Sequence, residues 1–87
     1  MSQEKRKSKR IERNTAAALV SVMGEPIIEC VLRDISATGA CISVEVPEVV
    51  PDYFFLKIEV LGEQLSPKCR VRWRSGNVLG VEFFRQA

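Results

Sequence analysis

The chain has no histidine among its 87 residues, so it lacks the side chain that most often acts as a general acid or base near neutral pH. Its three cysteines, Cys30, Cys41 and Cys69, lie far apart and form no Cys-x-x-Cys pair. Structural zinc requires four Cys or His ligands at short spacings, so no metal site is expected. We interpret the three thiols as reduced residues of the core or the surface.

Long apolar runs and phosphate-binding glycine loops are also missing. No run approaches the roughly 20 residues that cross a bilayer, and the opening segment MSQEKRKSKR lacks the apolar stretch of a secretory signal. We therefore expect a cytoplasmic protein without membrane insertion. Neither the P-loop nor the dinucleotide-binding glycine motif occurs, and no Ser or Cys has an evident activating base. The sequence predicts a protein that is not an enzyme and has no cofactor.

Charge is unevenly distributed along the chain. The overall net charge is +2, but residues 1–13 hold six basic and two acidic side chains, a net charge of +4. This segment has too little apolar surface to offset the entropy lost on ordering, so we predict a flexible basic arm over residues 1–13. Residues 14–87 are long enough for one small domain. Any partner of the arm should be an anion.

Beyond the arm, apolar residues alternate with polar ones, which predicts strands with one buried face. The predicted strands cover residues 16–23, 27–33, 40–46, 54–60, 68–74 and 79–83. The alanines of residues 16–23 leave a helix open as an alternative there. In the fifth segment we expect three side chains to point inward (Cys69, Val71 and Trp73) and four basic ones outward (Lys68, Arg70, Arg72 and Arg74). Six strands joined by short turns predict an all-β fold, a six-stranded antiparallel β-barrel with little or no helix.

Two short motifs contain candidate binding residues. Arg6 and Arg10 lie four residues apart in the arm, and a guanidinium can donate two parallel hydrogen bonds to a phosphate or to the Hoogsteen edge of guanine. The second motif, Asp34-Ile35-Ser36-Ala37-Thr38-Gly39, falls between two predicted strands. The Asp34 carboxylate is a suitable acceptor for the Watson–Crick donors of guanine. Taken alone, the second motif is more simply a turn with Gly39 at a positive φ, and the first a solvated tail.

Together, Arg-x-x-x-Arg and Asp-x-Ser-x-x-Gly resemble the paired signature of PilZ domains, a bacterial family of cyclic di-GMP receptors. The segments Arg70-Val71-Arg72-Trp73 and Gly80-Val81-Glu82-Phe83 are similar to the last two strands of the family. The resemblance covers about residues 5–84, nearly the whole chain. Because the sequence ends at Ala87, we do not expect the C-terminal helix of many PilZ proteins.

The resemblance also implies roles for individual residues. It implies a barrel that binds cyclic di-GMP on its outer face, with Arg6 and Arg10 contacting phosphates and guanine edges. Asp34 and Ser36 are implied to hold a guanine base, and Gly39 to let the ligand approach the backbone. Lys5 is implied to influence whether one or two nucleotides bind.

The main hypothesis is therefore a cyclic di-GMP receptor whose arm changes conformation on binding and signals to a downstream protein partner. The alternative is a small β-barrel that binds nucleic acid through the arm and the basic face of residues 68–74. We disfavour nucleic acid because most aromatic residues fall in predicted buried rows, whereas single-strand binders expose them for stacking. A PilZ fold that has lost its ligand is disfavoured by the two intact motifs.

Overall fold

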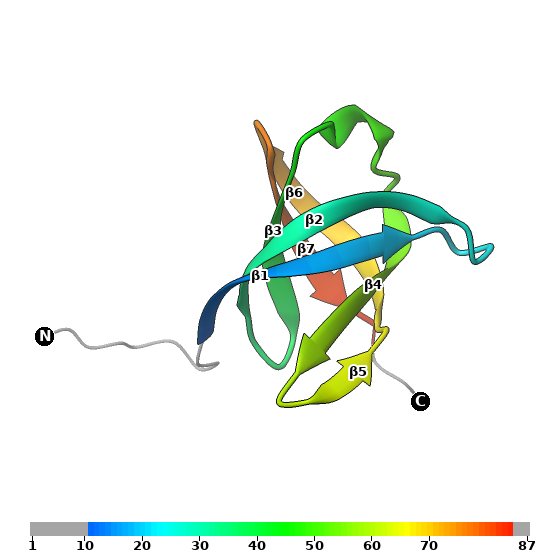
Figure 1. Ribbon diagram of the computed structural model, residues 1–87. Helices are drawn as coiled ribbons and strands as arrows, with labels where there is room; N and C mark the ends of the chain where they lie inside the picture. Colours follow the sequence, from blue (N-terminus) through cyan, green and yellow to red (C-terminus); the bar gives the residue numbers. More distant parts are fainter. Residues whose placement is uncertain (1–10, 85–87) are drawn as a thin grey trace, which may run out of the picture.

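The computed structural model of the protein describes the backbone of residues 11–84 and the side chains of residues 14–84. It contains seven strands and one short 3-10 turn (Figure 1). The elements are β1 (Ile11–Val20), β2 (Pro26–Ile35), β3 (Gly39–Val44), η1 (Pro47–Val49), β4 (Tyr53–Val60), β5 (Glu63–Leu65), β6 (Lys68–Ser75) and β7 (Val78–Phe83).

Six of the strands close into a barrel. The sheet order is β1-β2-β3-β7-β6-β4, and β1 also pairs with β4, so the first and last strands of the sheet meet. All of these pairings are antiparallel. This confirms the predicted six-stranded barrel. Within residues 11–84 the one helical segment is η1, and no helix there is long and apolar enough to cross a membrane.

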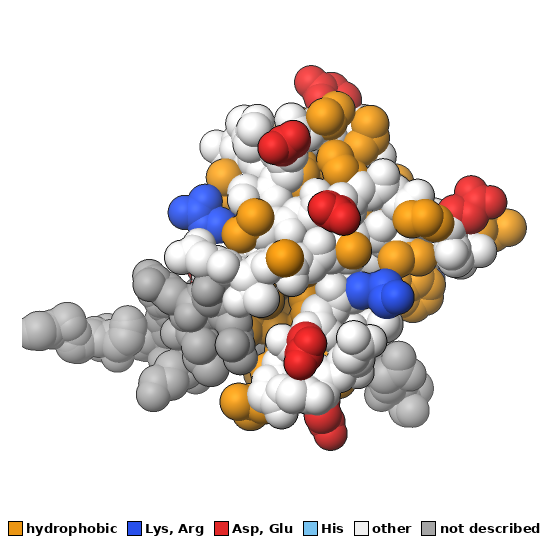
Figure 2. Space-filling view, viewed as in Figure 1, with side chains coloured by type: hydrophobic (Ala, Val, Ile, Leu, Met, Phe, Trp, Pro, Cys, Tyr) orange, Lys and Arg blue, Asp and Glu red, His pale blue; other side chains and the backbone are white. Residues whose placement is uncertain are grey.

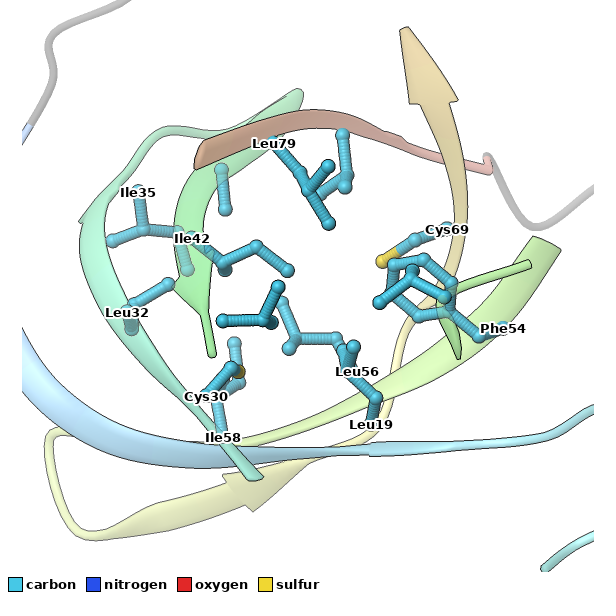
Figure 3. Close-up of a cluster of buried hydrophobic side chains, with 14 residues drawn as sticks. Leu19, Cys30, Leu32, Ile35, Ile42, Phe54, Leu56, Ile58, Cys69 and Leu79 are labelled. Atoms are coloured by element: carbon cyan, nitrogen blue, oxygen red, sulfur yellow. The ribbon is translucent and has the colours of Figure 1, made fainter. Parts of the chain in front are cut away.

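The interior of the barrel is filled by hydrophobic side chains, which come from every barrel strand (Figure 3). The largest fully buried ones are Phe54, Leu19, Leu32, Ile42, Leu56, Leu79 and Cys69. Each large aliphatic or aromatic side chain removed from water contributes about 1.5–3 kcal/mol to folding. No polar or charged side chain among residues 14–84 is buried. The interior is therefore a packed core, and a polar ligand must bind outside it.

The seventh strand, β5, was not predicted from the sequence. It pairs with β4 as a short hairpin beyond the barrel (Figure 1). All three of its residues are exposed, so it contributes no buried row that alternation could reveal. A strand without a buried face is invisible to a pattern of hydrophobicity.

The first strand begins and ends earlier than predicted. β1 begins at Ile11, where its backbone pairs with Ile35, and it ends at Val20. Residues 21–23, predicted as strand, lie in a turn in which the Ser21 hydroxyl accepts bonds from the backbone N–H groups of Met23 and Glu25, each at 3.1 Å. The proposed flexibility of the arm concerns residues that lie largely outside the described ones, and it stays a prediction.

Trp73 does not point into the barrel, and this prediction was wrong. The pairing of β6 with β7 shifts between Val71, which faces Val81, and Trp73, which faces Gly80. Arg72 is the extra residue of this β-bulge. A bulge inserts one residue into the alternation, so every later side chain changes face. Trp73 is consequently 50% exposed.

Candidate functional site

One row of residues crosses four neighbouring strands on the outside of the barrel. Asp34 of β2 pairs with Cys41 of β3, Cys41 with Gly80 of β7, and Gly80 with Trp73 of β6. On β3, Cys41 alternates with buried residues and so faces outward. Its partner Gly80 lies on the same face, where the Trp73 ring covers it. Strands lie about 4.8 Å apart, so the row is about 14 Å long.

Two β-bulges place the ends of this row on the outer face. The first lies between Leu32 and Asp34, with Arg33 as the extra residue. Regular alternation from buried Leu32 would turn Asp34 inward, whereas the bulge turns Asp34 outward and leaves Ile35 buried. The second bulge, at Arg72, turns Trp73 outward in the same way. The two bulges therefore bring a carboxylate and an indole to one surface.

The row forms the floor of a hollow of about 610 Å³. Its lining residues come from β2, from the loop before β3, and from β3, β6 and β7. They are Asp34, Thr38, Gly39, Ala40, Cys41, Arg72, Trp73, Gly80, Val81 and Glu82. This volume lies within the usual range of small-molecule sites, about 300–1,000 Å³.

The indole of Trp73 can lie against β7 because its partner there, Gly80, has no side chain. A Cβ atom built on Gly80 would lie 2.2 Å from both Nε1 and Cε2 of the indole. Any larger residue at position 80 would therefore push the ring away from β7. The ring leans on the barrel and still has half of its surface exposed, so it can offer a flat apolar surface to a planar ligand.

The segment from Asp34 to Gly39 forms a tight loop held by Ser36. The backbone N–H of Ser36 donates to the Gly39 carbonyl at 2.8 Å, and that of Thr38 donates to the Ser36 hydroxyl at 3.3 Å. The backbone N–H of Phe83 donates to the Thr38 carbonyl at 2.8 Å, which ties the loop to β7. The Ser36 hydroxyl thus has a clear local role in shaping the loop, as the simple turn interpretation requires.

Gly39 is required for close strand packing and not for a positive φ, so that part of the turn interpretation was wrong. The glycines with positive φ are Gly24, Gly62 and Gly76. A Cβ atom on Gly39 would instead lie 2.2 Å from the carbonyl oxygen of Val81. The glycine lets β3 approach β7 at the edge of the hollow.

The basic residues of β6 are engaged by neighbouring groups. Nη1 of Arg72 donates to Oε1 of Glu82 at 3.0 Å, and Nη2 of Arg70 lies 3.7 Å from the same oxygen. Nη2 of Arg74 donates to the Asp52 carboxylate and to the Val50 carbonyl, each at 3.0 Å. These exposed pairs stabilise the fold little, about 0–1 kcal/mol each. They do neutralise much of the basic face predicted for nucleic acid.

The aromatic residues are more exposed than the sequence predicted. Tyr53 and Phe84 stack on each other outside the barrel with their ring centroids 5.8 Å apart, and Nζ of Lys68 lies 5.4 Å from the Phe84 centroid. With Trp73, three aromatic side chains therefore have exposed rings. These exposed rings could stack on bases, so aromatic burial disfavours nucleic acid less than expected. The pairing of the β6 arginines with acidic side chains disfavours it more.

A second hollow, of about 590 Å³, lies across β1, β2 and β3. Its charged lining residues are Glu29 and Glu45, both acidic. Exposed apolar side chains gather at the η1 loop (Val46, which also lines this hollow, and Val49) and at the tip of the β1–β2 hairpin (Figure 2). The second hollow would repel an anion, so the hollow beside Asp34 is the better candidate.

The predicted site residues divide into two groups. Asp34 near the end of β2 and Gly39 at the start of β3 both line the hollow, and Ser36 lies in the short loop that joins these strands. Lys5, Arg6 and Arg10 lie outside the described residues. The arm joins the barrel next to the loop, because Ile11, the first described residue, pairs with Ile35.

Sequence reasoning missed the far side of the hollow, which consists of Trp73, Arg72 and Glu82. Trp73 was assigned to the core because it continues the alternation of Cys69 and Val71. The one available signal was Gly80, since a glycine inside a strand often marks a bulge or a close approach. In the described part of the chain no group of His, Cys, Asp or Glu is placed to hold a metal ion.

A small closed barrel with an apolar interior and an open hollow on its outer face has the architecture of a ligand-binding domain. The family model of the PilZ domain matches residues 4–87, essentially the whole chain, so the chain belongs to the PilZ family. PilZ domains are receptors for cyclic di-GMP and not a known family of enzymes. No curated protein matches the sequence.

Proposed function

We propose that this domain is a cyclic di-GMP receptor that binds the dinucleotide in the hollow between Asp34 and Trp73. The observation that carries the proposal is the outer row itself. It has a carboxylate at one end and an indole at the other, and the arm enters the barrel beside the carboxylate. Cyclic di-GMP offers two guanine bases, two phosphates and two negative charges, which match these features.

The two ends of the row suit the two kinds of contact that a guanine makes. The Asp34 carboxylate can accept both the N1–H and the N2–H of one base, which is a charge-assisted pair of hydrogen bonds. The exposed Trp73 ring can stack on a base, a contact typically worth about 1–3 kcal/mol. Ser36 and Gly39 support the site through the loop and the close packing of β3 on β7.

The phosphates are assigned to the arm. Arg6 is five residues from Ile11, and an extended chain spans at most about 3.3–3.6 Å per residue, or about 17 Å over this length. That reach exceeds the roughly 14 Å of the row. Arg10 and Arg6 can therefore both reach a ligand that lies across the four strands, with Lys5 close behind.

Binding would order the arm over the barrel and so change the surface that a downstream partner meets. Ordering a residue costs about 1–2 kcal/mol, and the charge-assisted contacts of the two arginines with phosphate would offset it. We place this switch in the cytoplasm of a bacterium. Backbone NMR relaxation with and without ligand tests it, because order parameters of the arm should rise from below ~0.6 toward ~0.85. An arm that is equally rigid, or equally mobile, in both states would contradict the switch.

The test of the receptor assignment is calorimetric titration with cyclic di-GMP, with GTP and a short oligonucleotide as controls. We expect a Kd of about 1 µM or lower, which corresponds to about −8 kcal/mol. GTP should bind much more weakly, since it has one guanine and no cyclic backbone. An oligonucleotide that binds as tightly as the dinucleotide at ~0.15 M salt would favour the nucleic-acid alternative.

A further inference from the structure

The carboxylate of Glu82 lies between two arginines at the edge of the hollow. Its Oε1 accepts a hydrogen bond from Arg72 at 3.0 Å and lies 3.7 Å from Nη2 of Arg70. On the other side, Glu82 pairs across strands with Gly39. Glu82 and Arg72 both line the hollow. An acidic side chain is therefore part of the surface that is proposed to take a dianionic ligand.

This acid makes the barrel wall a poor anion site by itself. The charged lining residues of the hollow are Asp34, Glu82 and Arg72, with a formal charge of −1. Arg72 would be the natural phosphate contact, but its Nη1 already donates to Glu82. Because the side chains of this pair are 54% and 42% exposed, the pair is weak and can be opened by a competitor.

We propose that Glu82 sets the affinity and specificity of the site by occupying Arg72 and Arg70, so that the barrel alone does not hold phosphates. Anion binding then depends on the arginines of the arm. A ligand must also make the guanine contacts with Asp34 and Trp73, so a simple phosphate compound without a base binds poorly. This inference rests on the proposed function in so far as the anion is cyclic di-GMP.

A different role for Glu82 would have the opposite effect on binding. As a second guanine acceptor, its carboxylate would attract the ligand, and its removal would weaken binding. Oε1 is already directed at the two guanidinium groups. Holding both donors of a guanine edge takes both carboxylate oxygens, so Oε1 would have to give up or share its hydrogen bond with Arg72 and its ion pair with Arg70. This favours the blocking role.

The experiment is the nearly isosteric variant Glu82→Gln, titrated with cyclic di-GMP and, separately, with inorganic pyrophosphate. We expect both ligands to bind about three- to tenfold more tightly at ~0.05 M salt, because one negative charge is removed and Arg72 is released. The gain should fall below about twofold at ~0.5 M salt, where the Debye length is only about 4 Å. Glu59→Gln is the matched control. It removes the same charge from an exposed position on β4 outside the hollow and should leave both affinities within about twofold.

Arg72→Ala completes the test as a double-mutant cycle. In the protein with Glu82 it should change affinity less than twofold, and in Glu82→Gln it should abolish the gain. Unchanged or weaker binding of both ligands by a folded Glu82→Gln protein would overturn the proposal. If cyclic di-GMP fails to bind any variant, the receptor assignment fails, and the pyrophosphate titrations still decide the role of Glu82.

Discussion

Replacing Gly39 by alanine should damage the barrel itself, and the structure gives the size of the effect. The new Cβ would lie 2.2 Å from the Val81 carbonyl oxygen, 1.2 Å short of the 3.4 Å at which ordinary contact begins. The Cβ position is fixed by the backbone of β3 and the oxygen belongs to the backbone of β7, so neither atom can rotate away. Strands β3 and β7 must separate locally.

We expect Gly39→Ala to lower the free energy of unfolding by about 2–4 kcal/mol. Overpacking of this kind costs about 1–3 kcal/mol, and weakening the hydrogen bonds beside it adds about 1 kcal/mol in all. The bonds at risk include those from Ser36 N–H to the Gly39 carbonyl and from Phe83 N–H to the Thr38 carbonyl. For a domain of this size the loss corresponds to a Tm lower by about 10–25 °C.

Urea unfolding followed by circular dichroism measures this loss, and Gly76→Ala is the matched control. Gly76 has φ +58° and open space around its Cβ position, so its replacement should cost only about 1–2 kcal/mol of backbone strain. A Gly39→Ala protein as stable as the original would refute the packing argument. Stability close to that of Gly76→Ala would show that the strands separate at little cost.

Three further predictions concern the hollow, the arm and the core. Gly80→Ala should displace the indole of Trp73, the only tryptophan, and so shift the tryptophan fluorescence. It should lower stability less than Gly39→Ala does, since a surface ring can move. An unchanged fluorescence spectrum would contradict the contact between Gly80 and Trp73. Arg10→Ala should weaken cyclic di-GMP binding by about 1.5–3 kcal/mol, as expected for a lost charge-assisted contact. An equal loss of binding free energy in Lys7→Ala would indicate diffuse electrostatic attraction instead of a specific contact. Burial raises the pKa of the Cys30 and Cys69 thiols from 9.0 to about 12. These two thiols should not affect stability well below pH 9, and they should lower it between pH 9 and 12, where the thiols of the unfolded chain alone ionise. A fall that is present in the original protein and absent from a double Cys→Ala variant would support this cause, and the same fall in both would exclude it.

Strand alternation predicted the barrel because the barrel has one buried face. Rows such as Phe54, Leu56 and Ile58 repeat with period two and are all buried, so a pattern of hydrophobicity contains the information that places them. The early start of β1 and the existence of β5 could not be found in this way. The backbone of Ile11 is paired, but the residues that follow it do not alternate, and β5 has no buried residue.

The candidate site was predictable only where a motif marks it. Asp34, Ser36 and Gly39 were found through the Asp-x-Ser-x-x-Gly pattern, although the alternation of β2 by itself would have turned Asp34 inward. The segment that contains Trp73 resembles a family strand, but the resemblance implied no binding role for Trp73, and its alternation gave the wrong face. In both strands the physical cause is the same, since a β-bulge changes the phase of a strand without a hydrophobic signal.

The packed interior gives a reason why the proposed receptor would need its arm. Fourteen hydrophobic side chains fill the barrel, so the ligand must lie on the outer surface, in a hollow that faces solvent. Small-molecule sites usually bury about 70–90% of the ligand, and one open face cannot do this. In the proposed function the remaining cover comes from the arm, which joins the barrel at Ile11, beside the end of β2 that holds Asp34. With Glu82 occupying the arginines of the barrel, the proposed role of the arm is to supply both the cover and the positive charge. Under this proposal, binding and the change of surface that a partner would meet are one and the same event.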